Sequence, residues 1–224
     1  MTHVLVLAAV DVEARGLARH LGLEPVGGAG WPHYRGGALE IAGIGVRGSC
    51  LEERVAGGSP PSLVVSAGAC GALAPDLAAG DLVVPETVIA PTGARHATDP
   101  RPGLVRAGAL LTVAELVETP AAKARLWVAT GALAVDMESA TIVTWARARG
   151  VPVVVVRGVA DTAQQTVPAD LAALVEPGGG VRAGRALRVA LGRPRAVADA
   201  VILGRGTAAA LKTVAAALGK IVRA

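Results

Sequence analysis

Short apolar runs alternate with amphipathic stretches along most of the chain, and this alternation predicts an α/β fold. Runs of about four to eight aliphatic residues bounded by Gly or polar residues are typical of buried strands. The run 151–163, which contains VVVV, is too apolar for a half-exposed strand and predicts a central one. We therefore expect strands within 3–10, 38–46, 62–73, 80–90, 108–116, 132–136 and 151–163.

Helical spacing of apolar residues separates these runs. It predicts helices within 11–23, 50–57, 120–131 and 137–150. Gly22 is suited to end the first of them and Pro120 to begin the third, since these residue types favour those positions. In 80–90, Pro85 marks an edge or a bulge.

The last part of the chain is rich in Ala, Leu and Val and predicts helix with breaks near 192–194 and 204–206. We find no internal repeat and no domain boundary before residue 177. The expected organisation is a catalytic domain over 1–180 and a basic helical tail over 181–224, packed on that domain or appended to it.

Charge is distributed unevenly in this chain of 224 residues. Nine Lys and Arg against one acid give 181–224 a net charge of +8, while 13 basic and 17 acidic residues give the preceding part −4. Such a tail predicts either contact with something anionic, such as a membrane surface, or a solvated helix face. Aromatic residues make up only 2% of the chain, which disfavours a nucleic-acid partner that stacks bases.

The remaining composition indicates a soluble cytoplasmic protein. No uninterrupted apolar run reaches the roughly 18 residues of a membrane span, and the start lacks a basic leader. The two cysteines, Cys50 and Cys70, predict a reducing compartment. No metal site is expected, because the four histidines form no ligand motif: His3, His20, His33 and His96.

Carboxylates follow three of the predicted strands. Glu13 comes after the first strand, Asp136 and Glu138 after the strand within 132–136, and Asp161 after VVVVRGVA. Taken singly, each is explained as a helix first-turn acid or a turn residue. In a parallel sheet, however, ligands bind outside the carboxyl ends of the strands. Acidic groups gathered there raise one another's pKa, which is typical of a functional site.

Three segments carry a resemblance to a known family. VLVLAAVDVEARGL, SAGACGALAPDLAAGDLVVPETVI and AVDMESATIVTWARARGVPVVVVRGVADTA resemble the nucleoside phosphorylase/nucleosidase superfamily, and within it the methylthioadenosine/S-adenosylhomocysteine nucleosidases. The C-terminal part from residue 165 resembles the hopanoid-associated branch, which is implicated in removing adenine from adenosylhopane. The resemblance implies a single-domain fold with a central mixed sheet flanked by helices, a homo-oligomer and no cofactor.

The resemblance also implies roles for individual residues. Glu13 would activate the attacking water, Glu138 would hold the ribose hydroxyls, and Asp161 would let purine N7 become protonated. The expected substrate-binding residues are completed by Met137 under the sugar, Asp136, the purine-framing Leu116, Val117 and Glu118, and Ala69, Cys70 and Gly71 near the anomeric carbon. Ala69 stands where the nucleosidases carry a Ser, and an aliphatic residue replaces their purine-stacking aromatic.

Chemistry favours hydrolysis of an adenosine-type nucleoside over phosphorolysis. A carboxylate at Glu13 suits a neutral water and repels phosphate, whereas a phosphorylase needs cationic groups. Arg15, Arg47 and Arg157 lie near strand ends, so a phosphate-dependent phosphorylase remains the alternative. A catalytically inactive nucleoside-binding protein is the second alternative.

Overall fold

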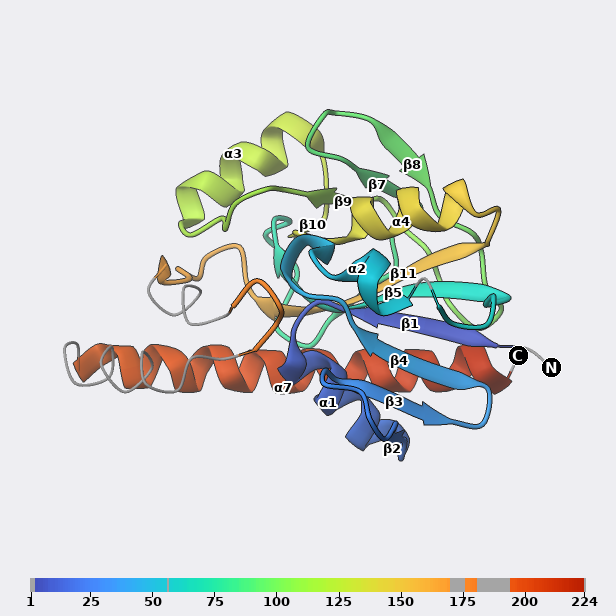
Figure 1. Ribbon diagram of the computed structural model, residues 1–224. Helices are drawn as coiled ribbons and strands as arrows, with labels where there is room; N and C mark the ends of the chain where they lie inside the picture. Colours follow the sequence, from blue (N-terminus) through green and yellow to red (C-terminus); the bar gives the residue numbers. More distant parts are fainter. Residues whose placement is uncertain (1–2, 56, 170–175, 181–193, 224) are drawn as a thin grey trace.

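The computed structural model describes residues 3–55, 57–169, 176–180 and 194–223 (Figure 1). One mixed sheet runs through this part of the chain. Its strands are β1 (Val4–Ala8), β2 (Glu24–Pro25), β3 (His33–Gly36), β4 (Leu39–Gly43), β5 (Leu63–Ala72), β6 (Leu82–Val83), β7 (Thr87–Ile89), β8 (Arg95–Ala97), β9 (Ala109–Thr112), β10 (Ala134–Asp136) and β11 (Val153–Asp161). The helices are α1 (Asp11–Leu21), the 3-10 turn η1 (Val46–Gly48), α2 (Leu51–Val55), α3 (Pro120–Thr130), α4 (Ser139–Ala148) and α7 (Pro194–Arg223).

Strand β5 is the centre of the sheet. It pairs in parallel with β1 and β11, and near its end it pairs antiparallel with β10. The main strand order is β2-β3-β4-β1-β5-β10-β9-β7-β8, with β11 between β5 and β6. The last residues of β5 lie between β10 and the end of β11, and the end of β1 lies beside Ser66 in the middle of β5. The predicted α/β class, with a mixed sheet flanked by helices, is confirmed.

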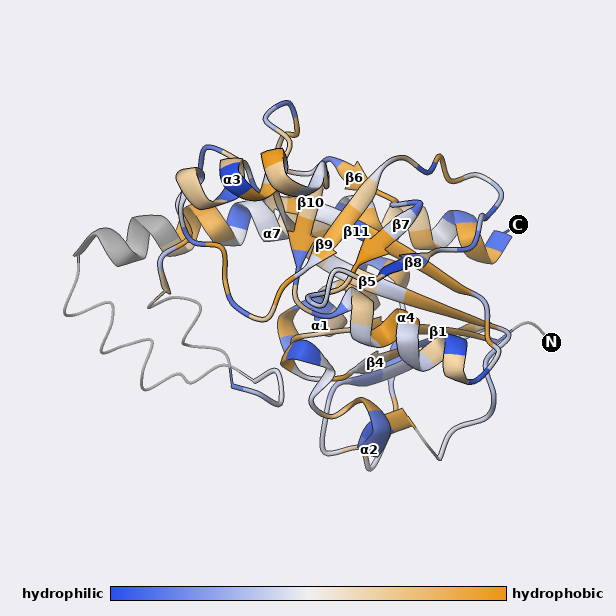
Figure 2. Ribbon diagram, turned by 90° about the horizontal axis from the view of Figure 1, so that it is seen from above, coloured by the Kyte–Doolittle hydropathy of each residue, from blue (hydrophilic) through white to orange (hydrophobic). Residues whose placement is uncertain are grey.

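Alternate residues of a buried strand pack into different cores on the two faces of the sheet. In β1, Leu5 and Leu7 pack on the face covered by α4, and Val4 and Val6 pack on the face covered by α1 and α7. This two-sided burial explains the near-continuous apolar runs, since a strand between two helical layers has no solvent face. Figure 2 shows the apolar strands enclosed in this way.

The C-terminal helix α7 differs from the expected tail. It is continuous through Gly204 and Gly206, where we predicted a break. A Cβ on Gly206 would collide with the carbonyl oxygen of Ala160, and one on Gly158 would lie 2.5 Å from that of Ala210. Gly206 and Gly158 therefore allow α7 and β11 to approach each other closely, and Gly206 does not end the helix. The other expected break, 192–194, and the stretch 181–193 fall mainly outside the described residues.

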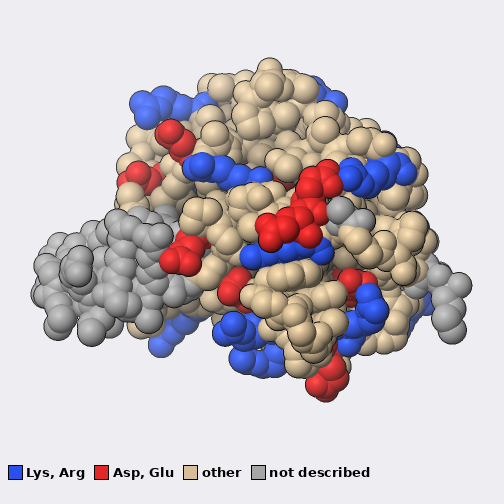
Figure 3. Space-filling view, in the orientation of Figure 1, with Lys and Arg blue, Asp and Glu red and all other residues tan. Residues whose placement is uncertain are grey.

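Helix α7 lies along one face of the sheet (Figure 1). Its segment Ala200–Arg223 is long and apolar enough to span a membrane by length and composition, with a mean hydropathy of 1.4. One apolar side of this helix nevertheless packs against the sheet, because Leu211, Val214 and Leu218 are buried in the core. Arg205, Lys212 and Lys220 are exposed. Figure 3 shows Lys and Arg interspersed with Asp and Glu over the visible face.

Several elements depart from the pattern-based boundaries. The strand expected within 80–90 is divided into β6 and β7, with Pro85 between them. The strand expected within 108–116 ends at Thr112, so Leu116 lies in a loop. Three strands escaped prediction because they are short and polar and have no buried residue: β2, β3 and β8.

Candidate active site

The last residues of β5 form the floor of the candidate site. Gly68, Ala69 and Cys70 pair with β11, and Gly71 pairs with both β11 and β10. A Cβ on Gly68 would lie 2.6 Å from Glu13 Oε1 and 2.7 Å from an Arg157 nitrogen. A Cβ on Gly71 would lie 2.9 Å from Asp161 Oδ2. Glycine at these two positions therefore lets charged side chains approach the backbone closely.

Glu13 is held by backbone N–H groups from two strand ends. Ala69 N–H donates to Oε1 at 2.7 Å, and the N–H groups of Ala9 and Val10 donate to Oε2 at 3.2 Å each. The side chain is buried although it belongs to the first turn of α1. These three donors fix a carboxylate beside the end of β5.

Glu138 stands at the N-cap position of α4 and is buried. Its Oε1 accepts a hydrogen bond of 2.9 Å from the backbone N–H of Arg47. Arg47 has a φ of 57°, a left-handed conformation that costs free energy in a non-glycine residue and that is often found at functional sites. Burial, reinforced by the charge of Asp136, raises the pKa of Glu138 to about 7.

Asp136 and Arg157 form a buried ion pair of 2.8 Å beneath Glu138. Thr112 Oγ1 (2.8 Å) and the N–H of Ser139 (3.1 Å) also donate to the Asp136 carboxylate. Both of its oxygens are therefore occupied, and Asp136 orients the start of α4 instead of offering a free carboxylate. Arg157 is 1% exposed and also donates to Ser66 and Ser139.

Asp161 ends β11 and is paired with Lys123 of α3. The Lys123 ammonium donates to Asp161 Oδ2, to Thr162 O (2.8 Å) and to Gln165 O (3.0 Å), and the lysine is 0% exposed. Burial raises the pKa of Asp161 above its ordinary value, and the charge and hydrogen bond of Lys123 partly oppose that rise.

Two adjoining cavities connect the three carboxylates. One of about 200 Å³ is lined by Asp161 and Glu138, and one of about 550 Å³ is lined by Glu13 and Glu138. Leu116, Met137 and Glu138 line both. Glu13, Glu138 and Asp161 thus border two neighbouring cavities that share lining residues, although they come from distant parts of the chain.

The other residues expected at this site divide into two groups. Those lining the smaller cavity are Ala69, Cys70, Gly71, Leu116, Val117, Asp136 and Met137. Glu118 lies elsewhere: its backbone oxygen accepts from Val167 N–H at 2.9 Å, and its side chain borders an outer depression. The loop that follows the shortened strand β9 places Glu118 away from the smaller cavity.

Cys70 lines the smaller cavity as a neutral residue, because burial raises the pKa of its thiol.

Sequence reasoning missed two contributors to the site. Lys123 stands in an Ala-rich helical segment where a single lysine looks solvent-exposed. Arg157 was noted only as a cation near a strand end, and its pairing with Asp136 depends on the register between β11 and β5. The one available signal was a charged residue within a fully apolar strand, VVVVRGV.

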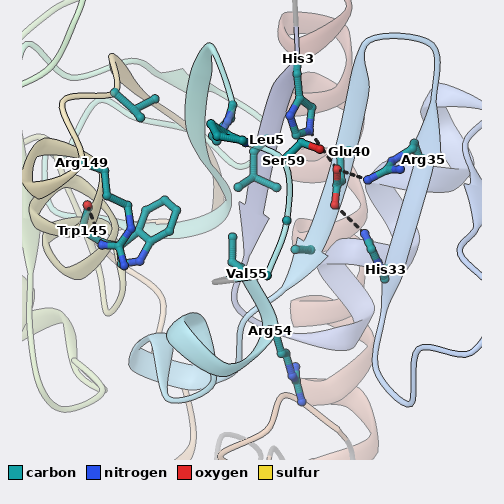
Figure 4. A pocket seen from close by; sticks show the side chains of 16 residues that line it. His3, Leu5, His33, Arg35, Glu40, Arg54, Val55, Ser59, Trp145 and Arg149 are labelled. Carbon is teal, nitrogen blue, oxygen red and sulfur yellow. Dashed lines mark hydrogen bonds and ion pairs between the residues drawn. The ribbon is translucent and has the colours of Figure 1, made fainter.

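A separate cavity of about 630 Å³ lies over β1, β3 and β4 (Figure 4). Its carboxylate, Glu40, interacts with His3 (2.9 Å), His33 (2.7 Å) and Arg35 (2.6 Å). Burial raises the pKa of Glu40, but the hydrogen bonds and charges of Arg35 and His33 outweigh it and leave that pKa below its ordinary value. Glu40 is thus paired with side chains that can carry positive charge, whereas Glu13 is held by backbone N–H groups alone.

Among the described residues, no group of three or more His, Cys, Asp or Glu side chains could hold a metal ion. Carboxylates gather around the end of β5, with the buried cation Arg157 beside Asp136 and the buried cation Lys123 beside Asp161.

The family profile described as Phosphorylase superfamily matches residues 5–107 and 94–192. No curated protein matches the chain.

Solved structures of similar fold cover all of this chain. They include a 5′-methylthioadenosine nucleosidase of Arabidopsis thaliana (16% identity, TM-score 0.68, 95% of its own length). A 5′-methylthioadenosine/S-adenosylhomocysteine nucleosidase of Helicobacter pylori has 19% identity, a TM-score of 0.69 and 98% coverage. A futalosine hydrolase variant of Helicobacter pylori has 18% identity, a TM-score of 0.69 and 99% coverage. At these identities the likeness shows the shared fold.

Proposed function

The chain belongs to the phosphorylase superfamily, and from this premise we propose that it is a purine nucleosidase that releases adenine from an adenosine-type nucleoside. One observation carries the proposal: Glu13, Glu138 and Asp161 border adjoining cavities that share Leu116, Met137 and Glu138. The similar solved structures include nucleosidases for 5′-methylthioadenosine, which supports this substrate class.

The two cavities fit the two halves of a nucleoside. The smaller one is bordered by Asp161 and by the aliphatic Leu116, Val117 and Val167, so it suits a flat base. The larger one is bordered by Glu13 and Arg47, so it suits the sugar and the attacking water. Glu138 stands between them, where its carboxyl group can bind ribose hydroxyls.

Each carboxyl group then has one task. Glu13 accepts a proton from water while the water oxygen bonds to the anomeric carbon on the face opposite the base. The electrons of the glycosidic bond pass to the purine, and Asp161 donates a proton to its N7. Glu138 strengthens its hydrogen bonds to the ribose as the ring gains positive charge. Each acid–base contribution amounts to roughly 10²- to 10⁴-fold in rate.

Electrostatics favours water over phosphate as the nucleophile. The buried cation nearest Glu13 is Arg157, and its charge is already balanced by Asp136 at 2.8 Å. An incoming phosphate would meet the Glu13 carboxylate, and within the described residues no buried cation that lacks a carboxylate partner offsets the repulsion. Arg47 borders the same cavity and is exposed, and it is the residue on which the alternative of phosphorolysis depends.

The larger cavity supports a nucleoside with an apolar 5′ group. Its walls include Ala9, Val10, Val46, Leu116 and Pro177, and its volume of about 550 Å³ exceeds that of the base cavity. The resemblance of the C-terminal part to the hopanoid-associated branch makes adenosylhopane the substrate that we propose within this class. An apolar substrate of this kind would be drawn from a membrane surface.

Membrane contact and assembly are further parts of the proposal. The exposed basic residues of α7, including Arg205, Lys212 and Lys220, could lie against an anionic bilayer, each adding about 1 kcal/mol near the surface. Removing 181–224 is a poor test, because the core would lose Leu211, Val214 and Leu218. Charge reversal of the exposed positions tests binding to anionic liposomes, and light scattering tests the proposed homo-oligomer.

The decisive test of the activity is a panel of substrates. Adenosine, 5′-methylthioadenosine and adenosines with long apolar 5′ chains are incubated with and without phosphate, and adenine and sugar products are quantified. Adenine with free ribose products, independent of phosphate, is expected. Ribose 1-phosphate formed only with phosphate would identify a phosphorylase, and nucleoside binding without product would identify an inactive binding protein.

A further inference from the structure

Lys123 is the least expected charge in the candidate site. It comes from α3, is 0% exposed and lines the smaller cavity beside Asp161. An ammonium group has three N–H donors, and the acceptors Asp161 Oδ2, Thr162 O and Gln165 O use all three. The lysine is thus a fixed positive charge held against the Asp161 carboxyl group.

This pairing leaves the two oxygens of Asp161 in different situations. Oδ2 faces the ammonium, whereas Oδ1 has no hydrogen-bond partner in the described part of the chain. Asp161 also lines the smaller cavity, and its side chain keeps 14% exposure. One oxygen is therefore held by the protein, and the other is available to a bound base.

We propose that Lys123 is a positioning residue for departure of the purine: it acts through Asp161 by orienting the carboxyl group and by balancing the negative charge left there after proton donation. This inference rests on the proposed nucleosidase function. The Asp161 O–H bond breaks as the N7–H bond forms, and the glycosidic electron pair goes to the purine. The resulting carboxylate is an ion-pair partner of Lys123, and solvent returns its proton after the base has left.

A purely structural lysine would behave differently. Lys123 also connects α3 to the loop 162–165, so its loss could loosen the site and slow every substrate alike. A leaving-group role instead slows only substrates whose leaving group needs a proton. Adenine is such a group, because it departs as a strong base unless N7 is protonated. The nitrophenolate of 4-nitrophenyl β-D-ribofuranoside departs without a proton.

The test compares Lys123→Gln with wild type on both substrates. Glutamine keeps N–H donors for the two backbone carbonyls and removes the charge. Lys212→Gln makes the same chemical change at an exposed position of α7 and serves as the matched control. We expect kcat for adenine release to fall roughly 100-fold in Lys123→Gln. Nitrophenol release should fall by less than about 3-fold, since it needs no acid catalysis.

A second comparison does not depend on folding of the single variant. Asp161→Asn is compared with Asp161→Asn/Lys123→Gln, in which both charges are absent. If Lys123 acts only through Asp161, the added change has no further effect on adenine release, since coupled residues are not additive. A further loss of about 10-fold or more would overturn the inference.

The remaining outcomes separate this inference from the proposed function. Equal slowing of both substrates in Lys123→Gln, with active wild type, overturns the role of Lys123 and leaves the nucleosidase assignment intact. A wild-type protein that releases adenine from no nucleoside overturns both.

Discussion

Replacement of Glu138 by Gln should make the ligand-free protein more stable at neutral and alkaline pH. Burial and the nearby charge of Asp136 raise the pKa of Glu138 to about 7 from the ordinary value of 4.5. Each unit by which the pKa in the folded state exceeds the pKa in the unfolded state corresponds to about 1.4 kcal/mol of folding free energy. The shift of Glu138 therefore corresponds to about 3 kcal/mol in total. Ionising this buried side chain therefore costs folding free energy.

The sign of the pH dependence follows from proton binding. Between pH 4.5 and about 7, folded Glu138 keeps a proton that the unfolded chain has lost, so wild-type stability falls as pH rises through this window. The amide of Glu138→Gln does not titrate and can still accept from Arg47 N–H. The stability difference between variant and wild type should therefore grow by about 2 to 3 kcal/mol from about pH 5 to about pH 8.

Urea unfolding followed by circular dichroism at both pH values measures this difference. Glu53→Gln removes an exposed carboxylate of α2 and should change stability little at either pH. The reasoning is refuted if the Glu138→Gln advantage is the same at both pH values. Loss of adenine release in the stabilised variant would fit a site that trades stability for function.

Three other predictions concern the fold and the chemistry. Gly206→Ala should destabilise the protein by about 1–3 kcal/mol, because the added Cβ collides with Ala160. Gly204→Ala should stabilise α7 by about 0.5–1 kcal/mol, because the added Cβ meets nothing within 4 Å. Thermal melting distinguishes the two variants, and equal effects would contradict the packing of α7 on the sheet. The pKa of Glu40 in the folded protein lies below its unfolded value, so the partners of Glu40 stabilise the protein above about pH 4.5 and this stability is lost as pH falls through the folded pKa. Acid unfolding of Glu40→Gln should lack this pH-dependent contribution. An acid transition equal to that of wild type would count against the stabilising role of the Glu40 partners. Ala69→Ser places a hydroxyl in the smaller cavity, beside the backbone N–H of residue 69 that donates to Glu13. The variant should keep Glu13 in place and change kcat without changing stability. A fall in melting temperature with no kinetic effect would argue against an active site at this position.

Much of this architecture follows from local patterns. The buried strands β1, β4, β5 and β11 and the helices α1, α3 and α4 lie where apolar periodicity and end residues place them, because burial on both faces leaves a clear mark on a strand. Glu13 and Asp161 could be identified as carboxylates at strand ends for the same reason. The edge strand β2 lacks that mark, since its exposed positions tolerate polar residues.

What escaped prediction depends on long-range packing. The glycines in 204–206 look like a helix break until Ala160 is known to lie against them. Lys123 looks like a surface residue until α3 is seen to close over the end of β11. We expected Asp136 to bind substrate. Only the register of β11 on β5 shows that the Asp136 carboxylate forms an ion pair with Arg157. Such features require knowing which distant segments meet.

The central claim is that Glu13 prepares water for attack on a purine nucleoside whose base is protonated by Asp161. The most direct measurement is adenine release in phosphate-free buffer by wild type, Glu13→Gln and Asp161→Asn, each checked for folding. The account predicts phosphate-independent adenine release by wild type and a loss of roughly 100-fold or more in each variant. Wild-type activity retained in Glu13→Gln would contradict it.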